Sequence, residues 1–173
     1  AATTCSPCLR ATEGRVTDAA MPKTRVKICG LKTPETIAAA VETGASYIGF
    51  NFFARSPRSV DFETAARLAI EVPFGVAKVG LVVNESDAFL TELTDRVALD
   101  MLQLHGGETP ERVADVKARF GLPVMKVIGV AEAGDLDPLE AHMAVADQIL
   151  IDAKAPKDAV LPGGNGLSFD WRL

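Results

Sequence analysis

Short runs of apolar and β-branched residues recur along the chain from Arg25 onward. Each run has the length of a strand, and because its residues are apolar on both faces it is typical of a parallel sheet that is covered on both sides. Six such strands are predicted, at residues 25–29, 47–52, 76–83, 100–105, 124–129 and 148–152. Between successive strands, apolar residues three and four positions apart predict amphipathic helices.

Two of the predicted helices carry the same start signal. The sequence Thr-Pro-Glu occurs at 33–35 and at 109–111, so a threonine N-cap precedes a proline at the first helical position, and an acid lies near the positive end of the helix. Gly44 and Gly121 then follow at positions where a left-handed residue commonly ends a helix. These signals support the alternation of strands with helices.

Strict alternation of strands and helices predicts a parallel sheet with helices outside it, in either a barrel or an open doubly wound sheet. The strand ends follow one another at a nearly constant interval, which favours the TIM (β/α)8 barrel because all its units are equivalent. One interval is longer, and the excess falls in the loop 53–60. This loop follows the carboxyl end of a strand, where such barrels build their active sites.

Composition narrows the functions that such a domain can have. The chain has 173 residues with 18 Lys and Arg against 23 Asp and Glu, and its basic residues form no dense block, so a nucleic-acid partner is not expected. The longest stretch without charge, 43–54, is shorter than the ~20 residues of a membrane helix. Three cysteines form no disulfide framework, and a cytoplasmic protein is expected.

Residues 1–21 differ from the patterned part of the chain, which we interpret as one domain over 22–173. They are rich in Ala and Thr and lack periodicity, so they are expected to be a disordered or non-native leader. Cys5 and Cys8 in this leader have the spacing of a redox pair. No second pair or nearby histidine completes a site in the sequence, so a chance pair is favoured.

Cys29 ends the first predicted strand and is followed by Gly30. By the alternation of side chains along a strand, Cys29 shares a face with Lys27, whose ammonium group would stabilise a thiolate. A thiol tuned in this way can act as a general base. The alternative is that Cys29 is a small, buried apolar residue.

Asp152 ends the sixth predicted strand, which is otherwise apolar. Carboxylates are rare in buried strands unless they are paired or used, and a partly desolvated carboxyl group can donate its proton as a general acid. A salt bridge to Lys154 is the alternative.

In the long loop, Arg58 has a planar guanidinium that suits a carboxylate. Arg55 competes for this role, and a solvated surface position is the alternative for either arginine.

Gln103 and His105 lie on one face at the end of the fourth predicted strand and are expected to orient a substrate. A histidine satisfied within the core is the alternative for His105. The glycines of 163–166 suit a loop that covers a ligand. Two histidines without ligand spacing predict no metal site, and no GxGxxG motif supports a dinucleotide, so no cofactor is expected.

Six motifs in chain order resemble the phosphoribosylanthranilate isomerase family of tryptophan biosynthesis. They are KICGL at 27–31, GFNF at 49–52 with SPRS at 56–59, VGLVVN at 79–84, QLHG at 103–106, LIDAK at 150–154, and GGNG at 163–166 ahead of FDW at 169–171. Together these motifs span the whole patterned part of the chain, which makes the resemblance far more specific than any single motif.

The resemblance implies a TIM barrel that is a cofactor-independent aldose-ketose isomerase. The implied reaction is the Amadori rearrangement of N-(5-phosphoribosyl)anthranilate to 1-(2-carboxyphenylamino)-1-deoxyribulose 5-phosphate, with this phosphorylated sugar-anthranilate as the partner and a monomer or homodimer as the assembly. Carried over from the family motifs, Cys29 is the general base, Asp152 is the general acid, and Arg58 assists at the anthranilate end. Some relatives also accept a histidine-pathway aminoaldose, and the sequence does not fix this breadth.

The chain is short for an eightfold barrel, which typically takes ~250 residues. Leu173 comes less than one βα unit after Asp152. We therefore expect a barrel truncated after its sixth strand, with strands 7 and 8 missing, the phosphate site beyond Leu173, and an inactive 173-residue product. Another phosphate-binding TIM-barrel enzyme and a non-catalytic half-barrel fragment are the alternatives.

Overall fold

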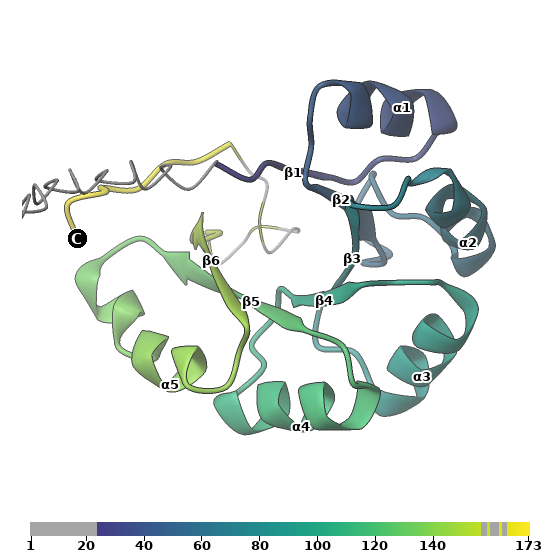
Figure 1. Cartoon of the computed structure of the whole chain (residues 1–173). Coiled ribbons are helices and arrows are strands. Elements are labelled where there is room, and N and C mark those ends of the chain that lie inside the picture. Colours follow the sequence, from purple (N-terminus) through teal and green to yellow (C-terminus); the bar gives the residue numbers. More distant parts are fainter. Residues whose placement is uncertain (1–23, 157–158, 160–162, 164–165) are drawn as a thin grey trace, which may run out of the picture.

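The computed structural model describes residues 24–156, 159, 163 and 166–173, in which strands alternate with helices (Figure 1). The elements are β1 Lys27–Cys29, α1 Pro34–Glu42, β2 Tyr47–Asn51, α2 Phe62–Glu71, β3 Ala77–Val82, α3 Asp87–Arg96, β4 Met101–Leu104, α4 Pro110–Phe120, β5 Val124–Val130, the short 3-10 helix η1 Ala133–Leu136, α5 Leu139–Met143 and β6 Gln148–Ala153. All six predicted strands are confirmed, with bounds that differ by one or two residues. The predicted leader, residues 1–21, lies outside the described residues, as do Cys5 and Cys8.

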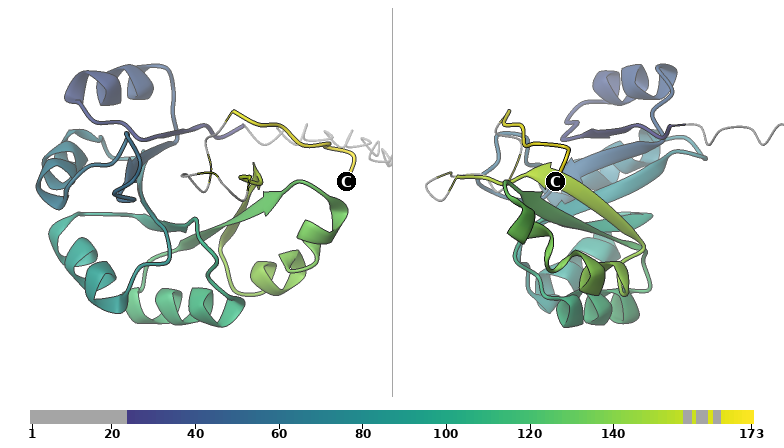
Figure 2. Two further views of the ribbon diagram at one scale, coloured as in Figure 1. Left: turned by 180° about the vertical axis from the view of Figure 1, so that it is seen from behind. Right: turned by 90° about the vertical axis from the view of Figure 1, so that its left-hand side faces the viewer.

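The six strands form one parallel sheet in which each strand pairs with its neighbours in the sequence, in the order β1-β2-β3-β4-β5-β6. The sheet curls into an open arc, and the helices lie in a ring outside it (Figure 1). Views from behind and from the side show the same layering, with no helix on the inner face among the described residues (Figure 2). This arrangement confirms the prediction of a curled parallel sheet. It excludes the alternative of an open doubly wound sheet, in which helices would cover both faces.

The structure confirms the predicted signals at the ends of the helices. Thr33 Oγ1 accepts a hydrogen bond from the backbone N–H of Thr36 at 3.3 Å, and Thr109 Oγ1 accepts one from the N–H of Arg112 at 3.3 Å. Gly121 ends α4 with a φ of 65°, in the left-handed region. These local contacts set where each helix begins and ends, and therefore how long each βα loop is. No helix among the described residues is both long enough and apolar enough to cross a membrane.

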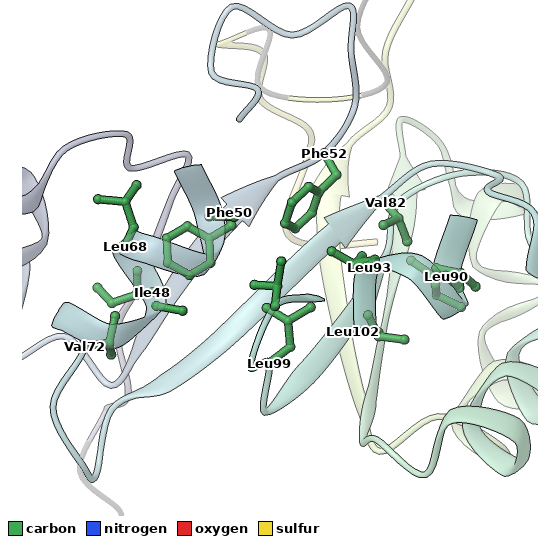
Figure 3. Packing of buried hydrophobic residues seen from close by; sticks show 14 of the residues in the cluster. Ile48, Phe50, Phe52, Leu68, Val72, Val82, Leu90, Leu93, Leu99 and Leu102 are labelled. Carbon is green, nitrogen blue, oxygen red and sulfur yellow. The ribbon is translucent and has the colours of Figure 1, made fainter. Parts of the chain in front are cut away.

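The main hydrophobic core fills the space between the sheet and the helices. Ile48 and Phe50 of β2 and Leu102 of β4 are fully buried and pack toward residues of α2 and α3 such as Leu68 and Leu93 (Figure 3). A second, smaller cluster lies on the inner side of the sheet and contains Tyr47, Val79, Met101 and Met125. Apolar side chains therefore lie on both faces of the sheet, as the sequence pattern predicts.

A buried ion pair joins strand β5 to the loops that follow β3 and β4. Lys126 Nζ lies 2.8 Å from Glu108 Oε2, and the two side chains are only 3% and 5% exposed. Lys126 also donates to the carbonyl of Gly106 at 2.6 Å, while the Glu108 carboxylate accepts from the N–H of Asn84 at 2.8 Å and the N–H of Gly106 at 2.9 Å. Asn84 Oδ1 in turn accepts from the N–H of Gly107 at 2.8 Å. The pair therefore satisfies the backbone polar groups of two adjacent loops.

Burial by itself raises the pKa of Glu108, but the hydrogen bonds from Lys126 and from the Asn84 backbone, together with the Lys126 charge, outweigh it. The pKa of this carboxyl group therefore lies below its ordinary value of 4.5 in the folded chain. The stabilisation that follows is fully present above pH 4.5 and is lost as the pH falls through the lower, folded-state pKa.

The substitution Lys126→Met is expected to lower the free energy of unfolding by about 3–5 kcal/mol, because it leaves the buried Glu108 carboxylate without its cation. The matched control is Lys117→Met, which removes a cation from the pair between Lys117 and Asp147, whose side chains are 42% and 34% exposed. Partly exposed pairs contribute less than about 1 kcal/mol. Urea unfolding of both variants measures the difference, and similar losses would contradict a structural role for the buried pair.

Candidate active site

One cavity at the carboxyl ends of the strands collects the candidate residues from β1, β2, β4 and β6. Its walls are formed by Lys27, Cys29, Asn51, Phe53, Ser56, Arg58, Leu81, Gln103, His105, Leu150, Asp152 and Gly163. All five of the site residues predicted from the sequence lie in this set. They come together because parallel strands bring their carboxyl ends to the same rim of the sheet.

Cys29 and Lys27 point into this cavity, as the alternation along β1 predicts. Both side chains lie over Gly49 of the neighbouring strand, where a Cβ would be 2.8 Å from Cys29 Sγ and 3.0 Å from Lys27 Nζ. A side chain at position 49 would therefore displace the thiol or the ammonium group. Gly49 leaves room for both side chains. The positive charge of Lys27 therefore lies on the same side of the strand as the thiol of Cys29.

Both arginines are exposed, but Arg58 lines the cavity and Arg55 is absent from its lining. Arg58 Nη1 donates to the carbonyl oxygen of Cys29 at 3.4 Å. The guanidinium is thus next to the end of β1. Of the two arginines that the sequence left in competition, the structure brings Arg58 to the site.

Asp152 lies next to His105 in the wall of the cavity. His105 Nε2 lies 3.4 Å from Asp152 Oδ2, and Asp152 Oδ1 accepts a hydrogen bond from the N–H of Ala153 at 2.9 Å. The alternative salt bridge from Asp152 to Lys154 is wrong, because Lys154 pairs with Asp135 instead. Asp152 therefore keeps its carboxyl group directed into the cavity.

Gln103 on β4 and His105 just after it line the cavity on the same face, as predicted, while Leu102 and Leu104 face the main core. Gln103 Nε2 is 3.5 Å from His105 Nδ1, while its Oε1 is buried and has no hydrogen-bond partner among the described residues. A buried amide oxygen without a partner is costly unless something donates to it. Gln103 thus offers an acceptor to a ligand in the cavity.

The pKa of His105 is lowered from its ordinary value of 6.5, first by burial and also by the positive charges of Lys126 and Lys27, while the Asp152 carboxylate opposes the shift. His105 is therefore neutral at pH 7. As the pH falls through 6.5, the unfolded chain takes up this proton before the folded chain does, so the group lowers the free energy of unfolding in acid.

Gly163 closes one side of the cavity. A side chain there would collide with the Asp152 carboxylate, and its Cβ would be 2.7 Å from the His105 ring. The expectation that the glycines of 163–166 cover a ligand stays a prediction, because residues 164 and 165 lie outside the described residues.

Two parts of the site escaped the sequence analysis. One is the pair formed by Asn51 and Ser56, which lies in the cavity wall. The other is the buried pair of Lys126 and Glu108 behind the rim. Lysine within the apolar strand β5 was the available signal for the second, since lysine is almost never fully buried without a partner. Within the described part of the chain, no cluster of His, Cys, Asp and Glu suits a metal ion.

The curled parallel sheet and the polar cavity at its carboxyl-end rim define a βα-barrel enzyme. Comparison with known proteins gives the family. The model of the N-(5'-phosphoribosyl)anthranilate isomerase family matches residues 26–173, and the chain belongs to this family.

Relatives of the same description are similar over most of the chain. The isomerase of Ruegeria sp. (strain TM1040) is 61% identical over 153 residues, which cover 88% of this chain and 71% of that protein. The isomerase of Paracoccus denitrificans is 64% identical over 148 residues, which cover 86% of this chain and 69% of that protein. The described fold is similar to the crystal structure of phosphoribosyl anthranilate isomerase from Thermotoga maritima, with a TM-score of 0.72 and 36% identity, over 86% of this chain and 69% of that one.

The substitution Asp152→Asn is expected to lower the pKa of His105 further, because it removes the negative charge that opposes the shift. The sequence has two histidines, so both ring signals can be followed by NMR as the pH is changed. His142 is the internal control, since its lowered pKa arises from burial and from residues other than Asp152. A rise in the pKa of His105, or an equal change at His142, would contradict the assigned contact.

Proposed function

We propose that this chain carries the acid, the base and the carboxylate-binding group of phosphoribosylanthranilate isomerase, which converts N-(5-phosphoribosyl)anthranilate to 1-(2-carboxyphenylamino)-1-deoxyribulose 5-phosphate. One observation supports this most: Cys29, Arg58 and Asp152 line the same cavity although they come from three separate βα units. Membership of the isomerase family supports the same reading.

In this proposal the acid acts first. Asp152 donates a proton to the ring oxygen of the ribose, while the nitrogen lone pair of the substrate forms a C=N bond and breaks the bond between C1 and that oxygen, which gives a protonated, positively charged imine. The contact of His105 Nε2 with Asp152 Oδ2, at 3.4 Å, supports a fixed orientation of the carboxyl group. Neutral His105 can donate a hydrogen bond to Asp152 once the proton has left.

The base acts next. Cys29 takes the proton from C2, and the electrons of that bond form a double bond between C1 and C2 while the nitrogen becomes neutral. The resulting enaminol becomes the ketone when C1 gains a proton and the C2 hydroxyl loses one. C2 is thereby oxidised and C1 reduced within one molecule, so we propose an intramolecular oxidoreduction that needs no cofactor. The Lys27 ammonium group lies over the same glycine as the thiol.

Three residues bind the substrate in this proposal. Arg58 binds the carboxylate of the anthranilate through its guanidinium, which suits a planar anion. Gln103 accepts a hydrogen bond through its buried Oε1, and His105 contacts the sugar beside Asp152. A site with fixed polar groups on rigid strand ends orients the substrate between the acid and the base.

We propose that the six units belong to a (β/α)8 barrel whose further loops hold the substrate phosphate, as is frequent in this fold. A cytoplasmic location stays a prediction, and so does the range of substrates that the enzyme accepts.

We propose that the assembly is a monomer or a homodimer. A Thermotoga maritima relative, 34% identical with a TM-score of 0.69 over 77% of this chain, is described as a dimeric isomerase that was converted to monomers. Light scattering of the protein at its full encoded length distinguishes the two assemblies.

Single substitutions of the acid and the base test the proposal. Cys29→Ala and Asp152→Asn, made in the protein at its full encoded length, are each expected to lower kcat by about 10²–10⁴, the range attributed to general acid–base catalysis. Circular dichroism should remain unchanged. Turnover within a few-fold of the unsubstituted enzyme in either variant would refute the role of that residue.

The two arginines of the long loop form a matched pair for the substrate-binding step. Arg58→Ala is expected to raise KM by roughly ten-fold or more, because it removes a charged hydrogen-bond partner of the carboxylate. Arg55→Ala is the control and should leave KM unchanged, since Arg55 is exposed and absent from the cavity lining. Steady-state kinetics measures both, and equal effects would contradict the assignment of Arg58.

A further inference from the structure

Arg58 is held at three points along its length. Its backbone N–H donates to Ser56 Oγ at 3.2 Å, and its Nη1 donates to the carbonyl of Cys29 at 3.4 Å. Between these points its aliphatic part lies over Gly30, where a Cβ would be 2.8 Å from Arg58 Cδ and where the φ of +83° favours glycine. An exposed side chain with many rotamers is thereby restricted to one direction, toward the cavity.

Ser56 is itself fixed by Asn51, at the end of β2. Asn51 Nδ2 donates to Ser56 Oγ at 3.2 Å, so this oxygen accepts one hydrogen bond from the strand and one from Arg58. Asn51 and Ser56 are 5% and 6% exposed. The hydroxyl group is therefore a buried connection between the sheet and the backbone of the arginine.

Asn51 also closes the long loop at both ends. Its Oδ1 accepts from the N–H of Phe53 at 2.8 Å, where the loop begins, and its backbone carbonyl accepts from the N–H of Val60 at 2.9 Å, where the loop ends. An apolar residue at position 51 would keep the second contact, which is made by the backbone, and lose the side-chain contacts to Phe53 and Ser56. The amide group thus serves the loop rather than the core.

We propose that Asn51 and Ser56 are positioning residues for Arg58, and that through Arg58 they determine selectivity for a ligand with a planar carboxylate. This inference rests on the proposed function, in which Arg58 binds the anthranilate carboxylate. A guanidinium has five N–H donors in a rigid fork, and the contact with Cys29 uses one of them. Because the side chain is oriented before the ligand arrives, less conformational entropy is lost on binding.

The test compares two ligands by isothermal titration calorimetry with the protein at its full encoded length. The first is reduced 1-(o-carboxyphenylamino)-1-deoxyribulose 5-phosphate, which is bound in a structure of a relative that is 35% identical, with a TM-score of 0.66 over 75% of this chain and 64% of that one. The second is the same compound without the ring carboxylate. The dissociation constant of the second ligand divided by that of the first measures how much the carboxylate contributes to binding. A large ratio means that the carboxylate contributes strongly.

Ser56→Ala and Asn51→Leu are expected to reduce this ratio by roughly ten-fold, the upper range for the loss of one neutral hydrogen bond, by weakening the carboxylated ligand alone. Ser56→Ala deletes one atom and is the milder change, while Asn51→Leu interrupts the same connection from the strand side. In an Arg58→Ala background both substitutions should have no further effect on the ratio, because they act through the arginine. Ser59→Ala is the matched control, since it removes a hydroxyl group of the same loop and should leave the ratio unchanged.

Two different failures can be distinguished. If Arg58→Ala reduces the ratio but Ser56→Ala and Asn51→Leu do not, or if these two weaken both ligands equally, the positioning role is wrong and the proposed function stands. If Arg58→Ala itself leaves the ratio unchanged, the carboxylate-binding role of Arg58 is wrong and the inference falls with it. Full additivity of Ser56→Ala with Arg58→Ala would also overturn the inference.

Discussion

Parallel pairing of the six strands is the constraint on which the rest of the structure depends. Each strand pairs with the next in the sequence, so every strand ends at the same rim and delivers the residues at its carboxyl end to one place. Cys29, Asn51, His105 and Asp152 are far apart in the chain and share no local motif. They line one cavity because the register of the sheet puts them there.

A rim of this kind has many loop backbone groups that need partners, and buried side chains supply them. Glu108 accepts from two loop N–H groups while Lys126 donates to a loop carbonyl, and the two buried charges pair with each other. Asn51 does the same for the loop after β2 without a charge. The loops after β2, β3 and β4 are therefore built on buried polar contacts, and these contacts give them a defined conformation.

The sequence predicted what depends on periodicity and on local signals. Strand alternation predicted which face Cys29 and Gln103 would present, and the threonine caps predicted where two helices begin, because both depend on a few neighbouring residues. The sequence left open which of Arg58 and Arg55 lies in the site and which residue pairs with Asp152, since both depend on contacts between distant segments. Lys126 and Glu108 lie eighteen positions apart along the chain and meet only when β4 and β5 pair, so the lysine in an apolar strand indicated that a partner was needed but not which residue it was.

The proposed base and acid lie on the two outer strands of the described arc, and this makes their separation sensitive to the whole sheet. β6 pairs with β5 over six residue positions, whereas β1 pairs with β2 over three. The short strand β1 is extended by the hydrogen bond from the N–H of Gly30 to the carbonyl of Gly49, at 2.7 Å, and by the contact of Arg58 with the carbonyl of Cys29. Because that contact joins the loop after β2 to the end of β1, the arginine that is proposed to bind substrate also restrains the backbone of the proposed base. The backbone position of Cys29 and the orientation of the guanidinium are therefore coupled through a single carbonyl group.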